Sequence, residues 1–61
     1  MNRFVKKYRE DIEEHGDEQK AFLEGIYNIH IFGAMDDLNA LIQAQNDYIH
    51  KSFEEAEREL I

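Results

Sequence analysis

The most constraining feature of this chain is a long amphipathic segment between Ala34 and Leu60. When residues 34–60 are drawn as a helix at about 100° per residue, apolar side chains gather on one side and polar ones on the other. The apolar side holds Met35, Leu38, Leu41, Ile42, Tyr48, Ile49, Phe53, Ala56 and Leu60. Because burial of such a face supplies most of a helix's stability, this segment is expected to pack against another surface.

The chain offers that face few partners, because it has only 61 residues. A domain of this size buries about 60% of its unfolded-chain surface, and it is marginally stable without a disulfide, a metal or a further copy. Cysteine is absent, which excludes disulfides and thiolate metal sites. We therefore expect a single small helical domain over residues 1–61 that assembles as a homodimer or a higher homo-oligomer.

Capping residues predict two further helices in the first half of the chain. Asn2 is a favourable N-cap, and Gly16 a favourable stop, for a helix over about residues 3–15. Asp17 is a favourable N-cap for a second helix over about residues 18–32.

A bend at Gly33 is expected next, because the apolar stripes of the second and third helices are roughly 100° out of phase. The third helix is then expected over about residues 34–60. The predicted fold is all-α: a short N-terminal helix plus a helical hairpin, assembled as a homo-oligomeric helical bundle. The alternative is an α+β fold, because residues 26–32 are mostly β-branched or aromatic and could form a short intersubunit strand. Helix is preferred, since strand alternation would leave neither face purely apolar.

The charge of the chain is acidic and unevenly distributed. Its net charge is −7, which disfavours direct binding to nucleic acid because phosphate contacts need a basic surface. Four of its cations nevertheless fall in the first nine residues: Arg3, Lys6, Lys7 and Arg9. No apolar run is long enough for a membrane span, so we expect a cytoplasmic protein without a membrane partner.

The third helix and the preceding junction supply the expected contact between copies. Its predicted residues are Phe32, Met35, Leu38, Ile42, Gln45, Ile49 and Phe53. Gln45 interrupts the apolar stripe, and a polar residue at such a position can fix the register of a symmetric helical interface.

A second set of residues is expected to contact a partner or a ligand. Its members are Arg3, Lys6, Lys7, Tyr27, Asn28, His30 and Tyr48. The cations suit an anionic ligand, and tyrosine is favoured where a surface must bind. His30 lies among apolar residues, so a hydrogen-bonded histidine in the core is its commonest role and a ligand contact is the alternative.

The sequence lacks the parts of a familiar catalytic site. Ser52 is its sole serine, threonine and cysteine are absent, and three scattered glycines form no phosphate-binding loop. Asp47 and His50 have the spacing of a helical metal-ligand pair, but both belong to the polar face. We therefore expect no enzyme activity, no cofactor and no bound metal.

These features favour a small acidic, homo-oligomeric binding protein that inhibits or regulates a partner macromolecule, such as a host protein. Phage and mobile-element regulators provide the analogy. The alternative is a protein that sequesters a small anionic, nucleotide-like molecule in a pocket between subunits. A third interpretation is mimicry of nucleic acid by the acidic surface.

Overall fold

The computed structural model describes residues 2–60, and it folds them into three α-helices and one 3₁₀ turn. The elements are α1 (Arg3–His15), α2 (Glu18–Phe32), η1 (Met35–Asp37) and α3 (Leu38–Leu60). No strand is present within residues 2–60, so the predicted all-α class is confirmed. The alternative of a strand over residues 26–32 is wrong, because these residues form the second half of α2.

The ends of α1 and α2 are fixed by the local chemistry of their caps. The side chain of Asn2 accepts a backbone N–H bond of 2.8 Å from the first turn of α1, and Asp17 accepts one of 3.1 Å from α2. Gly16 and Gly33 follow the two helices with φ angles of 68° and 66°, a left-handed conformation that costs glycine little. The three predicted caps and the predicted break at Gly33 are confirmed.

The core face of α2 explains why this segment forms a helix despite its β-branched residues. Ala21, Gly25 and Ile29 recur every four residues and are all buried. Gly25 lets α3 approach closely, because a Cβ atom at this position would lie 2.8 Å from the Cδ2 atom of Leu41. Tertiary packing on a helical stripe therefore outweighs the local preference for a strand.

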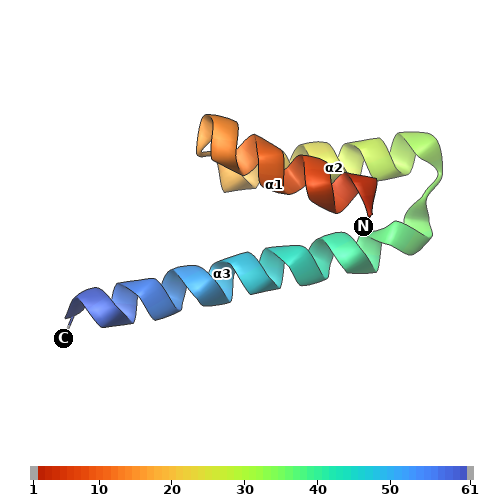
Figure 1. The fold of residues 1–61 in the computed structure, drawn as a ribbon. Coiled ribbons are helices and arrows are strands. Elements are labelled where there is room, and N and C mark those ends of the chain that lie inside the picture. The colour runs from red at the N-terminus through yellow and green to blue at the C-terminus, as the bar shows by residue number, and fades with distance from the viewer. Residues whose placement is uncertain (1, 61) are drawn as a thin grey trace.

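The three helices run alternately in opposite directions (Figure 1). α1 and α2 form an antiparallel hairpin, and α3 returns along both of them after the turn at residues 33–37. The buried core consists of Phe4, Val5, Tyr8, Ala21, Ile29, Leu41 and Ala44. α3 begins at Leu38 rather than at Ala34, because residues 35–37 form a 3₁₀ turn that the N–H of Asp37 closes on the carbonyl of Ala34 at 2.9 Å.

α3 is longer than the hairpin on which it packs. Its 23 residues span about 35 Å, whereas the 13 residues of α1 span about 20 Å. It therefore projects past the turn between α1 and α2 (Figure 1), and every residue from Asn46 to Leu60 is exposed. Among the helices of residues 2–60, none has an apolar stretch long enough to cross a membrane.

Candidate functional site

A polar contact joins all three helices near the start of α2. The Tyr8 hydroxyl of α1 donates a hydrogen bond of 2.9 Å to Oε2 of Glu18, at the start of α2. The Gln45 amide of α3 donates a second bond, of 3.1 Å, to the same oxygen. Burial raises the pKa of Tyr8, and the hydrogen bond to Glu18 raises it further. We call these three residues the polar node.

The polar node gives Gln45 a hydrogen-bond partner within its own chain. The sequence places Gln45 in the contact between copies, but its amide is already bonded to Glu18 in its own chain. Leu38, a second predicted contact, packs partly buried against the core of its own chain. The other five predicted contacts have exposed side chains: Phe32, Met35, Ile42, Ile49 and Phe53.

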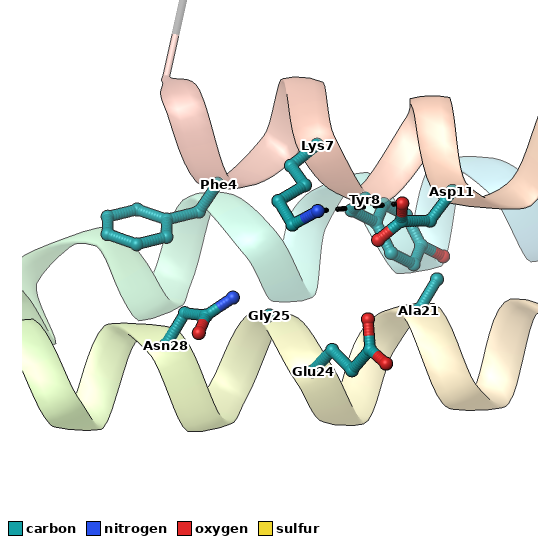
Figure 2. A pocket seen from close by; sticks show the side chains of 8 residues that line it. All are labelled: Phe4, Lys7, Tyr8, Asp11, Ala21, Glu24, Gly25 and Asn28. Atoms are coloured by element: carbon teal, nitrogen blue, oxygen red, sulfur yellow. Dashed lines mark ion pairs between the residues drawn. The ribbon is translucent and has the colours of Figure 1, made fainter.

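The seam between α1 and α2 is too tight to hold a ligand. Figure 2 shows side chains of α1, such as Tyr8 and Asp11, in the space between α1 and α2, across from Ala21, Gly25 and Asn28 of α2. The space between them has a volume of about 10 Å³, which is about that of one water-sized probe. The seam is therefore a packing interface.

Three of the predicted binding residues meet at the open end of this seam. Arg3, Lys7 and Asn28 line a depression of about 290 Å³ together with the rings of Phe4 and Phe32. The guanidinium carbon of Arg3 lies 4.9 Å from the centroid of Phe4 and 5.0 Å from that of Phe32, which is a cation–π geometry.

The depression has two cations, but one of them is already paired. The ammonium of Lys7 lies 3.7 Å from Oδ1 of Asp11, as the dashed line in Figure 2 marks. Arg3 is exposed, with its guanidinium over the rings of Phe4 and Phe32. An anion bound here would therefore contact Arg3 first and compete with Asp11 for Lys7.

The structure separates the other predicted binding residues from this depression. Tyr48 lines a groove of about 350 Å³ between α1 and α3, while Tyr27 and His30 are exposed on α2. Lys6 is exposed on α1. The prediction of a core histidine is wrong, because position 30 turns away from the stripe of Ala21, Gly25 and Ile29.

An uncovered apolar stripe runs along the outer side of α2. Leu23, Tyr27 and Ile31 follow one another at intervals of four residues, opposite the buried stripe of the same helix. Leu23 and Tyr27 are each 65% exposed. Sequence reasoning assigned Leu23 and Tyr27 to the same apolar stripe as Ile29 and did not include Ile31. We call these three residues the α2 outer stripe.

A second uncovered stripe runs along α3. Ile42 is 40% exposed, Ile49 38% and Phe53 66%, although all three belong to the apolar face that the sequence identifies. The hairpin buries the neighbouring residues Leu41 and Ala44, and Leu38 and Ala40 pack partly buried against it. Large apolar side chains aligned on an exposed helix face are characteristic of a surface that binds a partner.

Potential metal ligands are grouped only at the end of α1 within residues 2–60. Asp11, Glu14 and His15 offer ligand atoms within 4.8 Å of one another. Glu14 and His15 are exposed and Asp11 already pairs with Lys7, an arrangement that acidic helices commonly adopt without a metal. Asp47 and His50 have no third ligand beside them in the described part of the chain.

Comparisons with protein-family models, curated proteins and solved structures found no match to this chain.

Proposed function

We propose that this protein is a homo-oligomeric binding protein that inhibits or regulates a partner macromolecule by occupying its surface. One observation carries the proposal: large apolar side chains are aligned on two exposed helix faces outside the core. A single domain of this size gains stability by burying such residues, so two uncovered stripes indicate two contacts.

The two stripes suit two kinds of contact. The stripe on α3 is long and extends past the hairpin, so we assign it to a second copy of the chain. The α2 outer stripe is short, with anchors at i, i+4 and i+8 and a tyrosine at its centre. Helices of this pattern dock into apolar grooves, and tyrosine is enriched among residues that dominate binding energy. We assign it to the partner macromolecule, a protein with an apolar groove.

The proposal is tested by capture from a lysate of the cells that make the protein. The variant Leu23→Ala/Tyr27→Ala should capture at least about tenfold less of the partner than the wild type, as expected when hot-spot residues are truncated. The matched control Glu10→Ala/Gln19→Ala changes exposed polar residues of α1 and α2 and should capture as much as the wild type. Equal capture by both variants, or none by the wild type, would refute the proposed partner contact.

The depression at Arg3 favours a second candidate function, which is binding of an anionic, nucleotide-like molecule. An arginine held over two aromatic rings, with an amide from Asn28 nearby, can contact a phosphate and leave an apolar wall for a base. A thermal-shift screen with mononucleotides tests it. A rise in Tm that disappears in Arg3→Gln but persists in Arg58→Gln would support this function, and no rise in the wild type would rule it out.

A further inference from the structure

We infer that α3 forms a two-stranded antiparallel coiled coil with α3 of a second copy, and this inference rests on the proposed homo-oligomer. The contacting residues alternate at intervals of four and three, which is the spacing of a coiled-coil seam. They are Ile42, Asn46, Ile49, Phe53, Ala56 and Leu60, and we call them the α3 seam.

The α3 seam is distinct from the face that α3 uses within its own chain. Leu41 and Ala44 are buried and Gln45 is bonded to Glu18, whereas all six seam residues are exposed. At about 100° per residue, the seam is centred roughly a quarter to a third of a turn away from the buried face. A second helix therefore has room to lie along the seam while the polar node stays intact.

The seam lies on the flank of α3 beyond Gln45, on the side away from α1. Ala40, Ala44 and Asp47 line grooves with α1, while Gln45 reaches Glu18 on α2. Ile42 and Ile49 follow Gln45 around the helix in the direction away from α1. A helix on the seam would therefore also approach the flank of α2, where Phe22 and Ile26 are only partly buried.

The seam is complementary to itself when the two helices run in opposite directions. An antiparallel alignment that sets Ile42 opposite Leu60 also sets Ile49 opposite Phe53. It places Asn46 opposite Ala56, the smallest seam residue, which leaves space for the amide. Large residues then meet large ones over 19 residues, or about 28 Å of helix.

Charge favours the antiparallel direction over the parallel one. The last two turns of α3 carry Glu54, Glu55, Glu57 and Glu59. A parallel pair would bring eight glutamates and two negative helix-dipole ends together, whereas an antiparallel pair separates them by the length of the seam. The projecting half of each α3 then lies beside the hairpin half of its partner and gains the cover that it lacks alone.

Cysteine cross-linking tests this arrangement directly, because the chain has no cysteine of its own. Asn46→Cys and Ala56→Cys each change an exposed residue outside the core, so both variants should keep the fold. In the antiparallel pair these two positions face each other, while identical positions lie about 15 Å apart, too far for a disulfide. The control Arg58→Cys lies on the opposite side of α3 and reports random collision.

The expected result is a disulfide-linked dimer when Asn46→Cys and Ala56→Cys are mixed and oxidised. It should form at least about tenfold faster than for either variant alone or for either mixed with Arg58→Cys, because pairing raises the effective concentration of the thiols. Light scattering of the reduced mixture should show a dimer.

Three results would overturn the inference. Fast linking of each variant with itself would show a parallel pair. A dimer that links no faster than the control would place the contact elsewhere. Both results would overturn the antiparallel seam and leave the proposed homo-oligomer standing. A monomer by light scattering, with linking at the control rate, would overturn the inference and the proposed homo-oligomer together.

Discussion

At the scale of single residues, Tyr8 of α1 is buried and contacts α2 through both its ring and its hydroxyl. It is 1% exposed, its ring packs edge-on against Phe22 with centroids 6.2 Å apart, and its hydroxyl reaches Glu18. A buried hydroxyl needs such a partner, since leaving it unbonded would cost about 1–3 kcal/mol. The polar node therefore fixes how the three helices align, while the apolar core supplies the stability.

The raised pKa of Tyr8 predicts how stability falls at alkaline pH. A tyrosine whose folded pKa exceeds the unfolded value of about 10 contributes stability that is fully present below pH 10 and is lost as the pH rises further. We expect Tyr8→Phe to cost about 1 kcal/mol near neutral pH and to flatten the decline above about pH 10. Circular-dichroism melts from pH 7 to 11 would show this. Tyr27→Phe, at an exposed position, is the control, and an equally steep decline in Tyr8→Phe would contradict the assignment.

Gly25 is expected to resist replacement because of its contact with Leu41. Alanine would gain about 1 kcal/mol of helix propensity, but its Cβ would lie 2.8 Å from Cδ2 of Leu41, a side chain that is 0% exposed. Overpacking of this kind costs about 1–3 kcal/mol, so Gly25→Ala should be destabilised on balance. Chemical denaturation of Gly25→Ala measures the net effect. A free energy of unfolding above that of the wild type would show that the contact is looser than the structure indicates.

A second variant separates the Leu41 contact from other effects of alanine at position 25. Leu41→Ala alone should cost about 2–5 kcal/mol. In Gly25→Ala/Leu41→Ala the new methyl group fills part of the cavity, so the double variant should be more stable than the sum of the two changes predicts. Strict additivity would contradict a direct contact.

At the scale of elements, the sequence predicts what short-range chemistry decides. Asn2 and Asp17 begin the first two helices and Gly16 ends the first one as predicted, and the chain breaks at Gly33, because a cap depends on residues within one turn. The face that α3 buries depends instead on the close approach at Gly25, which a periodic pattern does not contain. The predicted apolar face is wider than the part that the hairpin covers, and the sequence alone does not show which part that is.

The fold also determines several placements that the sequence does not show. Gln45 is polar within an apolar stripe, a pattern equally expected of an intersubunit amide and of a bond to Glu18 from a distant helix. His30 has apolar neighbours in sequence, but its helical position directs it to solvent. Arg3, Lys7 and Asn28 meet only because α1 and α2 pack antiparallel.

The two parts of the α3 face should differ in how their variants respond to protein concentration. Leu41→Ala should lower Tm by a similar amount at every concentration, because Leu41 belongs to the core of one chain. Ile49→Ala should lower Tm mainly through the contact between copies, so the loss in Tm relative to the wild type should depend on protein concentration. Melts at several concentrations would test this, with Gln43→Ala as the exposed control. A concentration-independent loss for Ile49→Ala would contradict its place in an interface.

At the scale of the whole molecule, the shape and the charge act in opposite directions. The chain extends 45 Å along its longest axis because α3 projects from the hairpin, and that projection exposes apolar surface that favours association. The net charge of −7 on each copy opposes association. Burial of the α3 seam must exceed this repulsion for a stable pair to form.

Salt should therefore strengthen the pairing of copies. Added salt screens charges beyond about 8 Å at physiological ionic strength and leaves the burial of apolar surface in place. The Kd for self-association is expected to fall as sodium chloride is raised from low to physiological concentration. Sedimentation velocity at several salt concentrations measures it, and a Kd that rises with salt would show that opposite charges, rather than the seam, hold the copies together.

The most direct test of the account is the mass of the protein in solution, measured by multi-angle light scattering over a wide range of concentrations. One chain has a mass of 7.3 kDa, so we expect twice that mass at high concentration and a shift toward one chain on dilution. Ile49→Asp should remain a folded monomer throughout, because a carboxylate on the seam would lie unpaired between two apolar faces. A wild-type protein that melts cooperatively yet stays at 7.3 kDa at every concentration would contradict the claim that a second copy covers α3.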